Sequence, residues 1–322
     1  KGLLMFSDNG QFMLFTESDI FSPKTVRLKK ISSYECDNTI QPVDLGTSVL
    51  FTSNVSAYAR AFEATILDDD VPPNIIEQTR VVPEFLPKDI NKSTNSAAIG
   101  ITSYCKTGTS NIYHYKYYNA GNQREQSAWY TWTVKGTLLH TLYTGGLFYT
   151  VTFYHNQYIL SRHEYVADNT ANNAYQVGEG TVGSPTTISR RFEPCLDYLV
   201  APTAITASVP NDNTTLDIPY AVNPGEASLV QVLCISGNDT DGDSLAGSVF
   251  TGVQVIPGQN KIIIPKVKIS SSAKLMVGFR YTTTISLPTY YYNVGQNAYD
   301  LEGDLRISGI NFELGVSGPM EF

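Results

Sequence analysis

The stretch LLMFSDNGQFMLF (residues 3–15) reads as a strand, a turn and a second strand, and the same pattern recurs three times. The later copies are SVLFTSNVSAYARAF (48–62), AIGITSYCKTGTSNIYHY (98–115) and LFYTVTFYHNQYILS (147–161). Each turn is rich in Asn, Gly or Ser and lies between aromatic and β-branched runs, which favour strands. The anchors Phe12, Tyr58, Ile112 and Tyr158 are 46, 54 and 46 residues apart. This spacing is typical of propeller blades and predicts four blade-like antiparallel units; unrelated hairpins with coincidental spacing are the alternative.

Aromatic residues continue the pattern after the third copy. The run YHYKYY (113–118) alternates with period two, as half-buried antiparallel strands do. We predict that Trp129 and Trp132 share one face of a strand and are largely buried in a blade core.

A single short helix is predicted at PPNIIEQTRVV (72–82). Proline is favoured in a first helical turn, and a helix would place Ile75, Ile76 and Thr79 on one face. The preceding acidic run, residues 68–70, would favour the positive N-terminal end of that helix. The helix would end before Pro83.

The second half of the chain changes character after a polar stretch. From about Val166 to Ser189 the sequence is rich in Gly, Asn and Thr, which predicts a long loop or linker. Short strands with Pro and Gly in the gaps follow, and no alternating helices interrupt them. We therefore predict an all-β chain with very little helix: propeller-like antiparallel blades over residues 1–188, then one or more β-sandwich-like or barrel-like domains over 189–322.

Composition narrows the function classes. Charged residues make up only 16% of the 322 residues, whereas Tyr, Phe and Gly number 21, 14 and 24. The net charge of −8 argues against a nucleic-acid reader, which needs clustered Lys and Arg. The basic run from Lys24 to Lys30 is interpreted as protection of an exposed strand edge. No apolar stretch is long enough to predict a membrane span.

Motif-like strings do not predict catalysis or cofactor binding. Gly178, Gly180 and Gly183 form a GxGxxG, but Pro185 and a Ser/Thr run follow where a dinucleotide fold needs a helix. The string GNDTDGDSL (237–245) resembles half of a calcium loop, yet it lacks the Gly and Glu that an EF-hand requires and predicts a hairpin turn. No catalytic, cofactor-binding or metal-ligating residue is predicted, and no cofactor. No such role is predicted for the four histidines, His114, His140, His155 and His163. The four cysteines, Cys36, Cys105, Cys195 and Cys234, are interpreted as buried free thiols.

Three ordered segments carry a resemblance. They are SSYECDNTIQPVDLGTSVLF (32–51), AYARAFEATI (57–66) continuing to VVPEFLPKDI (81–90), and IYHYKYY (112–118) with QSAWYTWTV (126–134) and GGLFYTVTFY (145–154). Looser matches follow in the same order at NTTLDIPYAV (213–222), VIPGQNKIIIP (255–265), LPTYYY (287–292) and EGDLRISGINFEL (302–314). Together they resemble the tail tubular protein B, or tail nozzle, family of short-tailed phages.

The resemblance implies a structural virion protein of the phage tail and not an enzyme. It implies a homo-oligomeric ring, usually of six copies, that closes the lower end of the tail below the adaptor ring of tail tubular protein A. Tail fibres would attach near that junction, and viral DNA would leave through the channel without sequence-specific binding. Family members are longer than 322 residues, so we expect a fragment truncated at both ends.

Two other function classes stay open at this point. A glycan-binding or glycan-cleaving propeller module is suggested by Trp129, Tyr130 and Trp132, if their side chains are exposed. An unrelated secreted β protein is the third possibility. A ring subunit should instead carry two different extended apolar surfaces on opposite flanks, because ring contacts are heterologous.

Overall fold

The computed structural model describes residues 2–16, 22–54, 56–65, 73–120, 123–165, 175–181, 184–192, 196–208, 210–286, 292–295 and 298–300. All strand pairs within these ranges are antiparallel, and the helical elements among them are two short 3-10 segments, η1 (Ala97–Ile99) and η2 (Pro224–Leu229). The predicted all-β class with very little helix is therefore confirmed. The chain forms two compact units, Lys1–Ala167 and Asp168–Phe322. A domain division between residues 188 and 189 stays a prediction.

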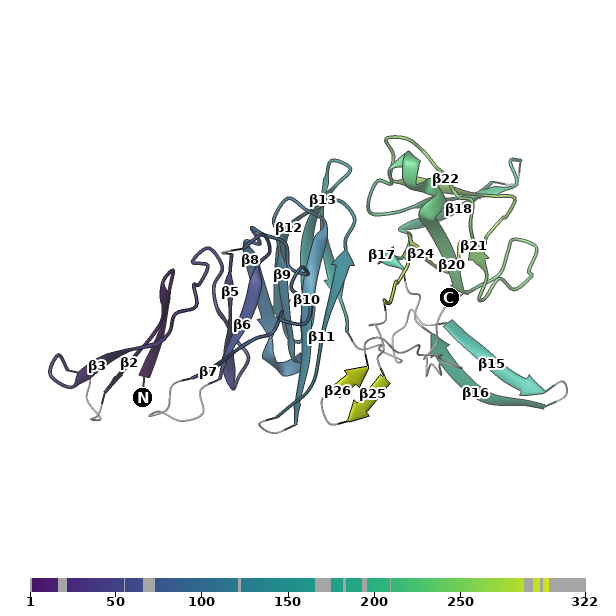
Figure 1. The fold of residues 1–322 in the computed structure, drawn as a ribbon. Helices are drawn as coiled ribbons and strands as arrows, with labels where there is room; N and C mark the ends of the chain where they lie inside the picture. The colour runs from purple at the N-terminus through teal and green to yellow at the C-terminus, as the bar shows by residue number, and fades with distance from the viewer. Residues whose placement is uncertain are drawn as a thin grey trace. The chain divides into compact units, whose positions relative to one another are not determined.

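Unit 1 contains four antiparallel sheets that follow one another in chain order (Figure 1). The first sheet is β1 (Gly2–Ser7), β2 (Gly10–Thr16) and β3 (Val26–Ser32). The second is β4 (Val43–Asp44), β5 (Ser48–Ser53), β6 (Arg60–Thr65) and β7 (Asn74–Glu77). The third is β8 (Lys92–Ser96), β9 (Ile101–Cys105), β10 (Asn111–Ala120) and β11 (Gln123–Thr133). The fourth is β12 (Thr137–Thr144), β13 (Leu147–Tyr154) and β14 (Gln157–His163).

Each predicted repeat forms the hairpin expected of it. The four hairpins are β1–β2, β5–β6, β9–β10 and β13–β14, one in each sheet. The turns of the first, third and fourth hairpins are short and polar, and in the fourth hairpin His155 and Asn156 take positive φ values of 46° and 61°. Asn tolerates the left-handed region better than most residues, because its short side chain can bond to the local backbone.

Apolar side chains pack the four sheets face to face. Phe6 of the first sheet lies 5.2 Å from Phe51 of the second, measured between ring centroids. Leu50 of the second sheet shares a core cluster with Tyr104 and Tyr115 of the third. Ile101 and Ile112 of the third sheet share another cluster with Leu138 and Phe148 of the fourth. Each inner sheet therefore buries both faces, which explains why their strands carry apolar residues on both sides.

The predicted helix at 72–82 is wrong. Asn74–Glu77 is strand β7, which pairs with β6 so that Ile75 lies opposite Ala64. Two consecutive β-branched residues favour a strand, and β7 satisfies backbone groups that β6 would otherwise leave unpaired at its edge. Ile75 packs against the Phe51 and Phe62 cluster, so tertiary contacts decide the conformation. The acidic residues 68–70 lie outside the described residues.

The prediction that Trp129 and Trp132 share one face is also wrong. The two side chains are half-buried and pack on opposite faces of β11. Trp129 lies 4.7 Å from Tyr115 in the cluster with the second sheet, whereas Trp132 lies 5.2 Å from Tyr165 in the cluster with the fourth. Residues three apart on a strand point in opposite directions, so the spacing itself excludes a shared face.

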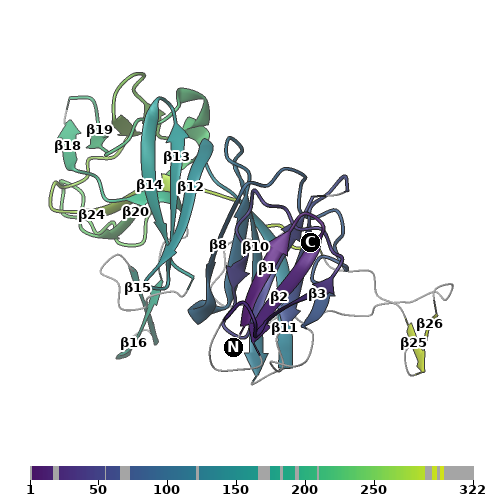
Figure 2. The same cartoon turned by 90° about the vertical axis from the view of Figure 1, so that its left-hand side faces the viewer.

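Unit 2 is built from short strands. One sheet has the order β17 (Asp197–Val200), β24 (Lys274–Phe279), β20 (Val230–Ser236) and β21 (Val249–Phe250). A second has the order β18 (Ala204–Ser208), β19 (Asn213–Asp217), β23 (Lys261–Pro265) and β22 (Gln254–Val255). Two separate hairpins are β15 (Tyr175–Thr181) with β16 (Ser184–Phe192) and β25 (Tyr292–Gly295) with β26 (Ala298–Asp300); several of these strands are labelled in Figure 2.

Burial in unit 2 follows the strand alternation. Leu216, Ile262 and Ile264 are buried on β19 and β23, between half-buried neighbours. Val232 and Val277 are fully buried and lie opposite each other on β20 and β24, which are neighbouring strands of the other sheet. The long loop predicted from Val166 to Ser189 is wrong for its later part, because β15 and β16 pair there. Thr, Val and Ile are interspersed among the glycines, and these residues favour strands, which is consistent with the β15–β16 pairing.

Candidate functional site

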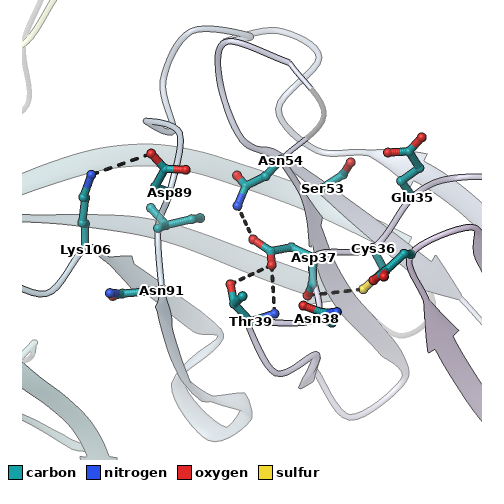
Figure 3. A pocket seen from close by; sticks show the side chains of 12 residues that line it. Glu35, Cys36, Asp37, Asn38, Thr39, Ser53, Asn54, Asp89, Asn91 and Lys106 are labelled. Atoms are coloured by element: carbon teal, nitrogen blue, oxygen red, sulfur yellow. Dashed lines mark hydrogen bonds and ion pairs between the residues drawn. The ribbon is translucent and has the colours of Figure 1, made fainter.

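A polar pocket of about 630 Å³ opens in unit 1 (Figure 3). Its walls come from the β1–β2 turn, the segment after β3, the end of β5, the segment before β8 and the residue after β9. The lining residues are Asp8, Glu35, Cys36, Asp37, Asn38, Thr39, Ser53, Asn54, Asp89, Ile90, Asn91 and Lys106. The lining contains four carboxylates and one ammonium group, so the pocket is acidic. Ligand sites are usually lined mainly by apolar side chains, and this pocket is not.

Several polar side chains of the lining form hydrogen bonds that connect the surrounding loops. Asp37 Oδ1 accepts hydrogen bonds from the Thr39 backbone N–H at 2.9 Å and from its hydroxyl at 2.7 Å, and the other oxygen accepts from Asn54. Asn91 Oδ1 accepts from the Thr107 backbone N–H at 2.9 Å. The bond from the Thr39 N–H to Asp37 is a local one of the kind that stabilises turns, whereas the Asn54 and Asn91 bonds join segments 17 and 16 residues apart. They make the pocket a junction of loops.

The remaining groups offer little chemistry. Burial, with the nearby carboxylates of Asp37 and Asp8, raises the pKa of Cys36 to about 11, which keeps the thiol protonated and poorly nucleophilic at neutral pH. Lys106 lies 3.9 Å from Asp89, and both side chains are largely exposed. Sequence reasoning did not find this pocket, because its residues come from five separate segments and form no motif.

A second polar cluster is buried between the third and fourth sheets. Ser103 Oγ lies 2.7 Å from His114 Nδ1 and 2.8 Å from the Tyr143 hydroxyl, which in turn lies 2.6 Å from the Tyr165 hydroxyl. Nearby, Thr150 Oγ1 lies 2.9 Å from His163 Nε2. Burial lowers the pKa of His114 to about 3, helped by His163, and burial lowers that of His163 to about 4. Both imidazoles are therefore neutral at pH 7.

The Ser103–His114 contact resembles a nucleophile with its base, but its surroundings are those of a core. Ser103 and His114 are 1% and 0% exposed, and His114 packs on Trp132 and Phe148 at 4.5 and 5.5 Å. A nucleophile must reach its substrate. A serine enclosed by two sheets does not, so this cluster is a structural feature of the interface.

A third cluster is ionic and lies between the second and third sheets. Glu63 on β6, which is 6% exposed, accepts from Arg124 on β11 at 2.7 Å and from Ser48 at 2.5 Å. Gln78 donates to the other Glu63 oxygen at 2.8 Å and accepts from the Tyr115 hydroxyl at 2.8 Å. Arg124 also lies 4.7 Å from the centre of the Tyr117 ring. Every charge is paired, as a buried ion pair requires.

Gly178 and Gly180 lie in a strand and not in the predicted loop, whereas the string at Asp239 forms a turn as predicted. Gly178 and Gly180 lie in β15, whose partner is a strand, and Gly183 lies outside the described residues. Asp239 Oδ1 accepts from the backbone N–H groups of Asp241 and Asp243 at 2.9 and 2.8 Å, which closes a turn. The buried free thiols are Cys36, Cys105 and Cys234, while the side chain of Cys195 is outside the described part.

The histidines separate into two groups. His114 and His163 belong to the buried cluster, whereas His140 and His155 are exposed. Among the described residues no group of three or more His, Cys, Asp or Glu side chains could hold a metal ion. Within the same residues no helix is long and apolar enough to cross a membrane.

The family relationship agrees with this structural character. The chain matches the family model of the bacteriophage nozzle proteins over residues 1–322, and it therefore belongs to that family. It is a structural component of the phage tail and of the virion.

One curated relative is a particular protein of this class, the "Tail tubular protein gp12" of Escherichia phage T7. The two sequences are 26% identical over 132 residues, which cover 40% of this chain and 16% of the relative. The match thus spans about a sixth of the relative's length, and the relative's whole activity does not transfer to this chain by similarity alone.

Proposed function

We propose that this chain is part of a subunit of the tail nozzle, the ring that closes the lower end of the tail tube and forms the channel for genome ejection. The observation that carries the proposal is the family match over all 322 residues. The ring would contain six copies and would lie below the adaptor ring of tail tubular protein A, with tail fibres near the junction. DNA would pass through without sequence-specific binding.

The architecture of unit 1 supports a rigid building block. Four sheets packed face to face through three apolar interfaces resist deformation, and we propose that they are blades of a propeller. A chain with 16% charged residues and 21 tyrosines suits a permanent assembly, whose contacts are rich in aromatics and poor in charge. The net charge of −8 also suits a DNA conduit, because a basic wall would retain phosphates.

The proposed role is structural and not enzymatic. The polar clusters of unit 1 are enclosed between sheets or bound to neighbouring loops. Trp129 and Trp132, which suggested a glycan site, pack between sheets, and Tyr130 stacks on His114 at 4.9 Å. Incubation with peptidoglycan or host polysaccharide should release no reducing sugar above a buffer control. Turnover that a single Asp or Glu substitution abolishes would contradict this part of the proposal.

Reconstitution tests the nozzle role directly. Tails purified from phage particles that lack their nozzle protein should gain density at the lower end when the protein is added, as seen by electron microscopy. The same particles should retain their DNA better than particles without the addition. Absence of the protein from tails, under conditions where it is folded, would refute the proposal.

A further inference from the structure

Buried hydroxyl groups without a hydrogen-bond partner gather at the interface between the second and third sheets. Within the described ranges, six buried side-chain oxygen or nitrogen atoms have no such partner. Four of the six are hydroxyl oxygens on these two sheets, and they belong to Thr52, Thr102, Tyr104 and Tyr117. Nearly all buried polar groups in native proteins are bonded to protein or to ordered water, so this concentration needs a physical explanation.

The strand register places all four side chains on the facing sides of the two sheets. Tyr104 and Tyr117 belong to the core cluster that joins the sheets. Thr102 is two residues from Tyr104 on β9 and therefore shares its face. Thr52 on β5 lies directly opposite Ala61, a member of the same cluster, and opposite residues of an antiparallel pair share a face. The four hydroxyls thus point into one interface.

These hydroxyls lie beyond the reach of bulk water. Thr52, Thr102, Tyr104 and Tyr117 are 2%, 0%, 1% and 5% exposed. Burial raises the pKa of Tyr104 well above its ordinary value and that of Tyr117 to about 12, and the Glu63 carboxylate adds to both rises. Both phenols therefore lie near Glu63, stay protonated at neutral pH and keep a donor that needs a partner. A buried hydroxyl without one loses the hydration that it has in the unfolded chain.

The charge balance of the interface argues against an ion as the missing partner. Glu63 and Arg124 lie 2.7 Å apart, and their charges cancel. An additional ion would be buried without a counter-charge, which is costly. The site instead suits a neutral molecule that both donates and accepts hydrogen bonds, and water is the molecule that normally binds to such groups inside proteins.

We propose that ordered water molecules bind between the second and third sheets and connect the Tyr104 and Tyr117 hydroxyls to the Glu63–Arg124 ion pair. The Arg124 guanidinium has further N–H donors beyond the three that bond to Asn119, Tyr115 and Glu63. Water at this place therefore satisfies the phenols and also adds hydrogen bonds to the ion pair, which lowers the cost of its desolvation. The site is independent of the proposed nozzle role.

A high-resolution crystal structure of the 322-residue chain tests the site directly. Solvent density should lie within hydrogen-bonding distance of the Tyr104 and Tyr117 hydroxyls, on the side that faces Glu63. An interface without such density, or hydroxyls that bond directly to protein groups instead, would overturn the proposal.

Removal of one hydroxyl gives an independent test whose sign is decisive. Tyr104→Phe keeps the ring, which lies 6.2 Å from that of Trp129, so the packing should persist. If the hydroxyl binds water, the equilibrium constant for urea unfolding should rise about fivefold, as for the loss of one hydrogen bond. If the hydroxyl is dry and unpaired, its removal relieves a desolvation cost, so unchanged or greater stability would refute the proposal. Tyr118→Phe, also on the third sheet but 62% exposed, is the matched control and should leave the constant unchanged.

A double-mutant cycle tests the connection to the ion pair. No direct hydrogen bond joins the Tyr104 hydroxyl to Glu63 in the described part of the chain. If water connects them, Tyr104→Phe and Glu63→Gln disturb the same network, so their combined effect on the unfolding constant should fall short of the product by at least about threefold. Effects that multiply would show that the two groups are not connected. The same cycle with Tyr118→Phe in place of Tyr104→Phe should be multiplicative.

Discussion

The two interfaces on either side of the third sheet use polar groups in different ways. Towards the second sheet, Glu63 and Arg124 form a charged pair 2.7 Å apart. Towards the fourth sheet, Ser103, His114 and Tyr143 form a neutral chain of hydrogen bonds. Both interfaces also contain a half-buried tryptophan from β11. The same strand therefore contributes to one ionic and one neutral interface.

The two interfaces therefore depend on different conditions for their stability. A buried ion pair depends on both charges being present, since removal of one leaves the other desolvated. A neutral cluster depends on its groups staying neutral, and His114 Nε2 is buried without a hydrogen-bond partner among the described residues. The first interface should thus be sensitive to loss of a charge and the second to gain of one. Both tryptophans of the chain lie in unit 1, so their fluorescence reports on this unit during unfolding.

The largest effect should come from the apolar part of the neutral interface. Phe148 is 0% exposed and lies 4.6 Å from Tyr143. Phe148→Ala should lower the free energy of unfolding by about 4 kcal/mol, because it leaves a cavity between two sheets. Urea unfolding followed by tryptophan fluorescence measures the loss. Phe153→Ala on the same strand, at a residue 37% exposed, is the matched control and should cost about 1 kcal/mol. Equal losses would show that the sheets do not pack as described.

Removal of one charge tests the ionic interface. Glu63→Gln keeps the shape of the side chain and leaves the Arg124 guanidinium without its carboxylate. We expect the free energy of unfolding to fall by about 3 kcal/mol. This value is at the lower end of the range for buried ion pairs, because the Arg124 side chain is 22% exposed. Asp89→Asn breaks the exposed Asp89–Lys106 pair and should cost less than about 1 kcal/mol. Similar losses in these two variants would mean that the Glu63 pair is effectively solvated.

Local sequence patterns were enough to predict the hairpins of unit 1. In LFYTVTFYHNQYILS the strand residues, the His155–Asn156 turn and the return strand are neighbours, so propensity and alternation agree. Segment 74–77 shows where such reasoning fails. Two isoleucines before a polar run suit either a helix or a strand, and the choice is made by pairing with β6.

The polar clusters could not be predicted, because they join distant residues. Arg124 and Glu63 are 61 positions apart, and Ser103 and Tyr143 are 40 positions apart. No spacing rule connects such pairs until the order of the sheets is known. The pocket around Asp37 has the same origin, with five segments meeting at a loop junction. The wrong prediction of a shared face for Trp129 and Trp132 has a different cause. Residues three apart on a strand point to opposite faces, so the spacing in the sequence was enough to exclude a shared face.

Acid should weaken the neutral interface. The pKa of His114 in the folded chain is about 3, below the ordinary value of 6.5, so the folded state disfavours its protonation. The resulting stability is fully present above about pH 6.5 and is lost as the pH falls towards the folded value. At pH 5 the loss from His114 should be roughly 2 kcal/mol. Tyr130, Tyr143, Tyr165 and His163 surround the ring, and none supplies a compensating negative charge, since burial raises the pKa of all three tyrosines.

Urea unfolding at a series of pH values measures this effect. His114→Phe fills a similar volume and cannot be protonated, so the stability of that variant should depend less on pH between 6.5 and 5, whatever its absolute value. His140→Gln, at an exposed position on β12, should leave the pH dependence unchanged. An identical pH dependence in His114→Phe and the unsubstituted chain would assign the acid sensitivity to other groups.

The smallest effect should come from a single hydroxyl of the neutral chain. Tyr165→Phe removes the 2.6 Å contact with the Tyr143 hydroxyl but leaves Tyr143 bonded to Ser103 at 2.8 Å. No buried group loses its last partner, so we expect a loss of about 1 kcal/mol, the usual net contribution of one hydrogen bond. Tyr158→Phe, at a residue 76% exposed, is the control and should change the stability by less than the measurement error. If Tyr165→Phe instead costs as much as Glu63→Gln, the hydroxyl chain acts as one cooperative unit, and the contrast between a charged and a neutral interface fails.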